Sequence, residues 1–139
     1  MKRLLLLATG GTIAGCADDS ATLNDYTAGV LGGDALLAGV SELNSLAEIT
    51  VEQIANVDSA DLLFEHWRAL LERIRDAFAV DPDLAGVVIT HGTNTLEETA
   101  WLLQLLIGDP RPVVLVGAMR PATALSADGP LNLFQAVQV

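Results

Sequence analysis

The chain has 139 residues, of which 51% are hydrophobic, and its mean hydropathy is +0.44. This length and hydrophobic content suit one folded domain and exclude a disordered chain. The formal net charge of −11 repels phosphate backbones and anionic membrane surfaces, so neither nucleic acid nor membrane is an expected partner. The single cysteine, Cys16, cannot form an internal disulfide, which favours a cytoplasmic location.

The first predicted element is a short buried strand. Lys2 and Arg3 precede leucines, as in a signal peptide. However, the apolar run Leu4 to Ala8 is shorter than the roughly 7–15 residues of a secretory segment or the roughly 18 of a membrane helix. A short continuous apolar run is typical of a parallel sheet that is covered on both faces. We expect a strand over Arg3–Ala8, followed by the glycine-rich stretch ATGGTIAG at 8–15.

The pattern then alternates between helices and strands. Residues 16–27 are polar and irregular, Gly32–Val40 is typical of a short helix, and Ala47–Asn56 of a second strand. From Asp61 to Phe78, apolar residues recur at helical spacing with charged residues between them. We expect Asp58 or Ser59 to cap this helix.

Four further elements are predicted: a strand over Gly86–Thr90, a helix over Thr95–Ile107 with Thr95 and Glu98 at capping-box spacing, a strand over Pro112–Gly117, and a helix from Asp128. Strands that alternate with helices imply parallel strands joined by right-handed crossovers. We therefore expect an α/β fold with an open, mainly parallel sheet and helices on both faces, a Rossmann-like three-layer arrangement. Because the last helix lacks a stop signal, we also expect residues 1–139 to form a domain that is incomplete at its C-terminus.

A polar cluster follows each predicted strand. Open α/β sheets bind ligands outside the carboxyl ends of their strands. The clusters are TGGT at 9–12, DSAD at 58–61, THGTNT at 90–95 and GAMRP at 117–121. We therefore expect all four clusters to face one crevice.

The stretch ATGGTIAG does not fit a phosphate loop. A dinucleotide fingerprint needs glycine where Thr12 stands, and no Gly-Lys-Ser/Thr follows for a Walker loop. A plain structural turn has the same bare pattern. A second threonine-bearing turn, HGTNT, favours a chemical role, because two such turns can supply a nucleophile and a hydrogen-bonding partner in one pocket. The glycines would then leave a substrate room to reach Thr12.

No metal or cofactor is expected. His66, His91 and Cys16 are too far apart in the sequence to give the spacing of metal ligands. Both histidines are interpreted as structural residues, and Asp128 as a helix cap. The leucines within Thr95–Ile107 are interpreted as a buried helix face, too short to span a membrane.

Four linked motifs carry a resemblance to a known family. ATGGTIAG, LNDYTAG around Tyr26, VVITHGTNTLEETA at 87–100 and VVLVGAMRPATALSADGPLNL at 113–133 together resemble the N-terminal part of bacterial-type L-asparaginases. The resemblance implies hydrolysis of L-asparagine, or of glutamine, without a cofactor, by a protein that assembles as a homodimer or tetramer. The smaller C-terminal domain of that family has no counterpart in these residues, so exposed apolar surface is expected to make the chain self-associate.

The resemblance also implies roles for residues of the motifs. Thr12 corresponds to the nucleophilic threonine, and Tyr26 to the lid tyrosine that hydrogen-bonds to it. Thr93 corresponds to the second catalytic threonine, beside the developing oxyanion. Ser59 corresponds to a serine that binds the substrate α-carboxylate, which suits a helix N-terminus. The other corresponding positions are Gly11, Asp58, Ala60, Gly92, Asn94 and Ala118, the last offering its backbone carbonyl to the amide nitrogen.

Three departures from the family pattern bear on activity. Asn94 stands where aspartate usually pairs with the substrate ammonium and a catalytic lysine, so we expect an affinity lower by roughly ten- to a hundred-fold. Ala60 replaces a common glutamine, and Asp58 a common glycine, so that Asp58 would repel a substrate carboxylate unless its side chain turns outward. No lysine corresponds to the catalytic one, so the isolated chain is expected to be inactive.

Three hypotheses of function remain open. The first is an L-asparaginase whose isolated N-terminal part does not turn over substrate. The second is a binding or assembly domain that keeps the crevice without the chemistry. The third is an asparaginase-like subunit of a tRNA-dependent amidotransferase, which the net charge of −11 disfavours.

Overall fold

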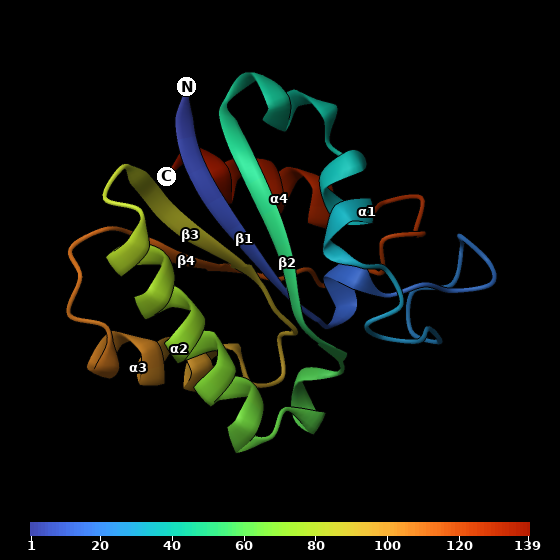
Figure 1. The fold of residues 1–139 in the computed structure, drawn as a ribbon. Coiled ribbons are helices and arrows are strands. Elements are labelled where there is room, and N and C mark those ends of the chain that lie inside the picture. Colours follow the sequence, from blue (N-terminus) through green and yellow to red (C-terminus); the bar gives the residue numbers. More distant parts are fainter.

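The computed structural model describes all 139 residues, and its centre is a sheet of four parallel strands. The strand order is β2-β1-β3-β4, with α-helices between the strands (Figure 1). The predicted open parallel sheet is confirmed. The elements in chain order are β1 (Lys2–Gly10), α1 (Gly33–Ala38), β2 (Ala47–Val57), α2 (Phe64–Val80), β3 (Leu84–Thr90), α3 (Leu96–Leu106), β4 (Val113–Val116) and α4 (Gly129–Gln138).

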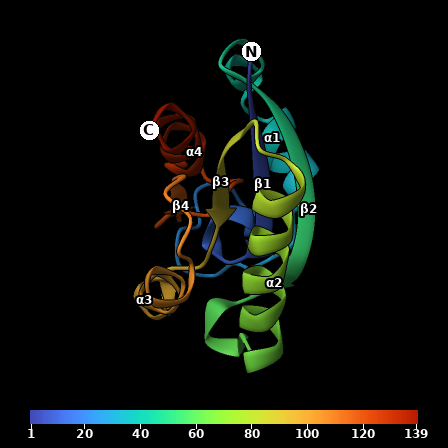
Figure 2. The ribbon, with the colours of Figure 1, turned by 60° about the vertical axis from the view of Figure 1, so that its left-hand side comes forward.

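The leucine run of β1 separates two hydrophobic cores. Successive side chains of a strand point to opposite faces, so a strand that is covered on both faces needs an unbroken apolar run. Leu6 packs in one core with Leu36 of α1 and Leu133 of α4. Leu5 and Leu7 pack in the other core, with α2 and α3. Figure 2 shows the two pairs of helices on the two faces of the sheet.

The strand order also determines where a ligand can bind. The connection through α1 leads from β1 to β2 on one side, whereas α2 then leads across β1 to β3 on the other side. The connections after β1 and β3 therefore diverge, which leaves a crevice outside their carboxyl ends. The turns that begin at Gly11 and His91 leave the sheet at this point.

The helix expected from Asp61 begins later, at Phe64. Residues Ser59–Asp61 form a separate 3₁₀ turn, and Asp58 caps that turn by accepting the backbone N–H of Ala60 at 2.8 Å. At the start of α2, His66 Nδ1 accepts the backbone N–H of Leu63 at 2.9 Å. The predicted cap at 58 or 59 is thus wrong for α2, because the chain is extended at Leu63 before the helix forms.

Two expectations for α3 are corrected. Thr95 occupies the N-cap position, but its hydroxyl donates to the carbonyl of Ser59 at 2.9 Å and makes no capping bond to its own helix. The helix is also not a fully buried face. Leu103 is buried, but Trp101, Leu105 and Leu106 are exposed to 67%, 66% and 44%, because the helix covers the edge strand β4 with one side only.

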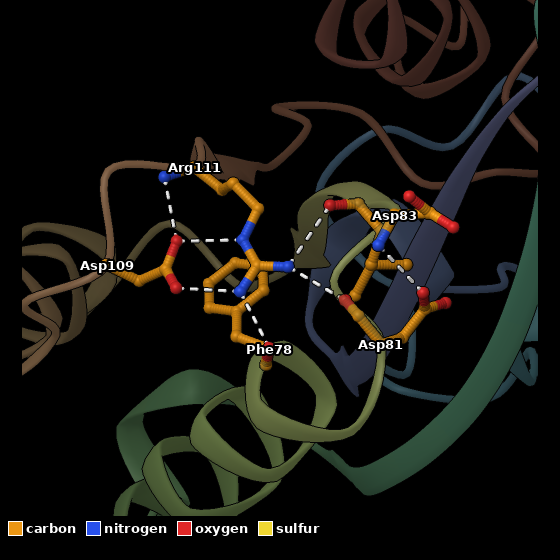
Figure 3. A network of polar contacts seen from close by, with 6 residues as sticks. Phe78, Asp81, Asp83, Asp109 and Arg111 are labelled. Carbon is orange, nitrogen blue, oxygen red and sulfur yellow. Dashed lines mark hydrogen bonds and ion pairs between the residues drawn. The ribbon is translucent and has the colours of Figure 1, made fainter.

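An arginine joins the end of α2 to the loop before β4 (Figure 3). The Arg111 guanidinium donates to both carboxylate oxygens of Asp109 and to the backbone carbonyls of Phe78 and Asp81, both at 2.8 Å. The central guanidinium carbon of Arg111, Cζ, lies 4.1 Å from the centre of the Phe78 ring. The hydrogen bonds from Arg111 lower the pKa of Asp109 to about 2. Arg111 thereby satisfies carbonyl groups at the C-terminal end of α2.

Candidate functional site

The turn after β1 contacts the turns that follow β2 and β3. The backbone N–H of Gly11 donates to the carbonyl of Val57 at 2.8 Å. Gly11 has a φ of +78°, and a Cβ at this position would collide with the backbone of Gly92. A Cβ on Gly92 would in turn lie 2.6 Å from Ser59 Oγ. Residues of the predicted clusters that follow β1, β2 and β3 are therefore packed together at the crevice.

Thr12 and Tyr26 form the closest pair of functional groups in the crevice. Their hydroxyl oxygens lie 2.7 Å apart, and either can be the donor. Thr12 begins a 3₁₀ turn and is only 8% exposed. Tyr26 comes from the irregular segment after β1, which is held by two backbone hydrogen bonds of 2.9 Å between Cys16 and Thr27.

The glycines around Thr12 serve the packing of the turn. A Cβ on Gly15 would lie 2.9 Å from Tyr26 Cδ2, so the absent side chain lets the tyrosine ring pass. The space beside Gly11 is taken by Gly92. Chain atoms thus occupy the positions where side chains would stand, and the expectation that the glycines leave a substrate room to reach Thr12 stays a prediction.

Ser59 is a buried junction between the turn after β2 and the start of α3. It is 2% exposed, and its Oγ accepts the backbone N–H groups of Asn94 and Thr95 at 3.1 and 3.3 Å. The N-terminus beside Ser59 is thus that of α3, not that of the helix after β2 as the sequence suggested. With both bonds accepted, the Ser59 hydroxyl keeps its own hydrogen for a further acceptor.

Asp58 and Asn94 pair across the crevice from different turns. Asn94 Nδ2 donates to Asp58 Oδ1 at 2.9 Å. The same Oδ1 accepts the backbone N–H of Ala60 at 2.8 Å, so the carboxylate is held by two donors. The Ala60 side chain itself is exposed and short. No local pattern indicates this pair, because 36 residues separate its members.

His91 fixes the turn that carries Thr93. It is fully buried, its Nδ1 lies 2.7 Å from the carbonyl of Gly92, and its Nε2 lies 2.8 Å from Thr99 Oγ1. A carbonyl can only accept, so Nδ1 carries the hydrogen, and Thr99 donates to Nε2 while accepting the Trp67 indole N–H. Burial lowers the pKa of His91. These contacts support the structural interpretation of His91.

Thr93 itself is exposed at the mouth of the crevice. Its Cγ2 would lie 3.1 Å from a Cβ on Gly117, the residue that follows β4. The fourth predicted cluster therefore also reaches the crevice. Ala118, the next residue, is 2% exposed.

Asp128 shapes the turn after Ala118, a role that sequence reasoning missed. Its carboxylate accepts the backbone N–H groups of Met119 and Arg120, both at 2.9 Å, and makes no capping bond to α4. Burial opposes ionisation most strongly, but the donors together outweigh it and lower the pKa of Asp128. The predicted helix cap is wrong, because the carboxylate accepts from Met119, Arg120 and the side chain of Asn132 instead of from a backbone N–H of α4. No local signal in the sequence connects Asp128 with Met119.

Residues 3–139 match the model of the family described as Asparaginase, N-terminal. The chain belongs to the asparaginase family. It is 46% identical over its full length to L-asparaginase 2 of Bacillus subtilis, covering 37% of that protein. It is also 46% identical to the glutaminase-asparaginase of Acinetobacter glutaminasificans, over 98% of this chain and 41% of that one.

The fold agrees with a solved structure of the asparaginase family. The probable cytoplasmic L-asparaginase of Campylobacter jejuni superposes with a TM-score of 0.95 at 50% identity, over 99% of this chain and 41% of that chain. The chain thus spans about two fifths of the length of the relatives it matches. None of its helices combines the length and hydropathy that a membrane crossing requires.

Proposed function

We propose that these residues are the substrate-binding and nucleophile-bearing part of an asparaginase that hydrolyses the side-chain amide of L-asparagine to give L-aspartate and ammonia. The contact of 2.7 Å between the hydroxyls of Thr12 and Tyr26 carries this proposal. A threonine hydroxyl is a weak nucleophile until a neighbouring group accepts its proton. The names of the relatives, L-asparaginase and glutaminase-asparaginase, support an amino-acid amide as the substrate.

The chemistry proceeds in two displacements. Thr12 Oγ1 attacks the amide carbon, the carbon–nitrogen bond breaks, and the hydroxyl proton passes through the Tyr26 hydroxyl to the nitrogen, which leaves as ammonia. The product of this step is a β-aspartyl ester on Thr12. Water then attacks the ester carbon, the bond to Thr12 breaks, and a proton returns to its oxygen. The reaction needs no redox step, and none of its steps uses a metal or cofactor.

The turns around Thr12 supply the groups that hold the substrate. The free hydrogen of the Ser59 hydroxyl donates to the α-carboxylate. The turn from Gly92 to Thr93 presents N–H and hydroxyl donors to the oxygen that gains charge in each displacement. The carbonyl of Ala118 accepts from the amide nitrogen that leaves.

We expect the 139 residues alone to bind substrate without appreciable turnover. Both ring nitrogens of His91 are engaged by Gly92 and Thr99, so this histidine cannot act as a base for Thr93. The one lysine of the sequence, Lys2, begins β1 at the opposite end of the strand from Thr12. The same observation favours a second candidate function, a binding domain that does not perform the chemistry.

The deciding experiment combines binding with ammonia release. NMR titration with L-asparagine is expected to shift signals of residues 12, 26, 59 and 92–94, and shifts confined to other surfaces would contradict the site. Ammonia release that disappears in Thr12→Ala would establish the threonine mechanism and show that these residues suffice. Release that is equal in Thr12→Ala would overturn that mechanism. Binding without release is the result we expect.

The location and assembly of the protein are proposals of the same kind. We infer a cytoplasmic location from the lone Cys16, although one relative is named as a probable periplasmic L-asparaginase. We also infer self-association, supported by the exposed side chains of Trp101 and Leu105 on α3. Sedimentation that shows only monomer at high concentration would contradict self-association.

A further inference from the structure

The tyrosine segment, residues 17–26, has few hydrogen bonds to the rest of the chain. Cys16 and Thr27, which flank it, are joined by two backbone bonds of 2.9 Å. From the segment itself, hydrogen bonds lead to only three residues outside it, which are Thr12, Thr123 and Leu125. The first of these bonds is the contact between Tyr26 and the proposed nucleophile. The other bonds that restrain the segment therefore all come from the loop between β4 and α4.

This loop, residues 117–128, holds the tyrosine segment through one side chain and one backbone group. The Thr123 hydroxyl accepts the backbone N–H of Ala17 at 2.9 Å and donates to the carbonyl of the same residue at 3.4 Å. Further along, the backbone N–H of Leu125 donates to the carbonyl of Ser20 at 3.1 Å. The Leu125 side chain is 85% exposed. Thr123 is thus the one side chain of the loop that bonds to the segment.

The loop is held in place by bonds that do not involve Thr123. At its start, the backbone N–H groups of Met119 and Arg120 donate to the carboxylate of Asp128 at its end, both at 2.9 Å. In its middle, the backbone N–H of Ala122 donates to the carbonyl of Gly15 at 2.8 Å. The loop therefore offers the tyrosine segment a fixed support.

We propose that Thr123 is a positioning residue for Tyr26. By bonding to Ala17, Thr123 holds the tyrosine segment where the Tyr26 hydroxyl reaches Thr12. The catalytic meaning of this position rests on the proposed function, in which the proton of Thr12 passes through Tyr26 to the leaving nitrogen. The same loop carries Ala118, whose carbonyl is proposed to accept from that nitrogen. The group that holds the nitrogen and the group that brings its proton are thus attached to one unit of the chain.

The first test measures opening of the segment. Thr123→Val removes the hydroxyl and keeps the branched shape of the side chain. In hydrogen exchange followed by NMR on the full chain, the amides of Cys16 and Thr27 are expected to exchange about five-fold faster than in wild type, the effect of one lost hydrogen bond on a local opening. The amide of Leu6, a fully buried residue of β1, is the reference for unfolding of the whole chain and is expected to keep its rate.

The second readout follows the tyrosine directly. Tyr26 is the only tyrosine, so a chain with ¹³C at tyrosine Cζ gives one signal. In Thr123→Val this signal is expected to move toward its position in Thr12→Ala, where the hydroxyl contact is absent. Thr123→Ser keeps the hydroxyl and should restore both readouts. Thr22→Val is the matched control within the segment, because Thr22 bonds only through its backbone N–H.

The outcomes separate this inference from the proposed function. Wild-type exchange rates, or an unmoved tyrosine signal, in Thr123→Val overturn the role of Thr123. Equal changes in Thr22→Val, or at the Leu6 amide, overturn it as well, because they show a general loss of stability. No substrate is used, so failure of the chain to bind L-asparagine contradicts the proposed function and not this inference.

Wild type alone provides a test if Thr123→Val folds poorly. One opening releases Cys16, Ala17 and Thr27 together, so their amides should be protected from exchange to a similar degree. Protection of the Ala17 amide that is more than about ten-fold below that of the other two would show that its bond to Thr123 does not hold the segment.

Discussion

The carboxylate of Asp128 accepts the backbone N–H of Met119 at 2.9 Å, and this bond links the start of α4 to the turn that follows β4. A second bond of 2.9 Å, from Arg120, goes to the other carboxylate oxygen. Ala118, whose carbonyl is proposed to hold the amide nitrogen, directly precedes these two residues. The position of that carbonyl therefore depends on a side chain ten residues later in the chain.

Asp128→Asn tests this dependence. The two backbone donors, Met119 and Arg120, each bond to a different oxygen of Asp128. Asparagine has only one acceptor oxygen, so one of these N–H groups would face the NH₂ group and lose its partner. We expect the free energy of unfolding to fall by about 1–2 kcal/mol, as measured by urea denaturation. Asp18→Asn, at an exposed loop residue, is the control and is expected to leave it unchanged.

The same variant has a signature in acid. The pKa of Asp128 is lowered in the folded chain, so the ionised carboxylate stabilises the fold fully above the unfolded value of 3.8. This contribution is lost as the pH falls through the folded pKa. The stability difference between wild type and Asp128→Asn should therefore shrink in acid, and a difference that is constant down to the acid transition would contradict it.

His91 is predicted to make stability depend on pH near neutrality. Its pKa is lowered by burial, so below pH 6.5 the unfolded chain binds a proton that the folded chain resists. The free energy of unfolding should decrease as the pH falls through this range, by at most about 1.4 kcal/mol per pH unit. NMR titration of the imidazole should give a midpoint for His91 below 6.5. A midpoint at or above 6.5 would contradict the lowering of the His91 pKa by burial.

Gly15→Ala should displace the Tyr26 ring from Thr12. The added methyl group would lie 2.9 Å from Tyr26 Cδ2, which is closer than carbon atoms pack. Tyr26 is the only tyrosine, so a chain whose tyrosine is ¹³C-labelled at Cζ, the carbon that bears the hydroxyl, gives one ring signal that reports the hydrogen bond. The signal should move in Gly15→Ala, and in the same direction in Thr12→Ala.

Gly108→Ala is the matched control for this experiment, because a Cβ at Gly108 meets no atom within 4 Å. Its tyrosine signal should coincide with that of wild type. If Gly15→Ala also leaves the signal in place, the glycine does not serve to admit the tyrosine ring.

Arg111→Lys is predicted to lower the urea midpoint more than Arg68→Lys does. The planar guanidinium of Arg111 bonds to Asp109 and to carbonyls of the α2 C-terminus while it stacks on Phe78, and a lysine ammonium cannot make these contacts together. Arg68 forms only an exposed pair with Glu72 at 3.8 Å. Equal effects of the two substitutions would show that the network in Figure 3 does not stabilise the end of α2.

The strands, and their alternation with helices along the chain, were predictable because each depends on a short continuous stretch of sequence. The leucines of β1 form one continuous apolar run. Such a short run is typical of a parallel strand that is covered on both faces. The helix starts were harder. Asp58 is a good capping residue, but it caps a 3₁₀ turn, and the two extended residues before Phe64 leave no clear mark in the sequence.

The side-chain partners were not predictable for a different reason. Thr95 has the spacing of a capping box, yet its hydroxyl bonds to Ser59, which is 36 residues away. Asp58 with Asn94 and Asp128 with Met119 are likewise joined only after the sheet has formed. The residue types at the crevice could be identified from motifs, whereas the bonds among them depend on tertiary structure.

The contact between Gly11 and Gly92 has a mechanical consequence. No side chain separates these two glycines, and Ser59 accepts the backbone N–H of Asn94. The turns after β1, β2 and β3 therefore form one rigid unit. These turns cannot separate without breaking backbone contacts. Tyr26 lies in a different segment, the one that is closed by the two backbone hydrogen bonds between Cys16 and Thr27. If the crevice closes on a small molecule, the segment that carries Tyr26 would be the part that moves, and the turn that carries Thr12 would stay in place.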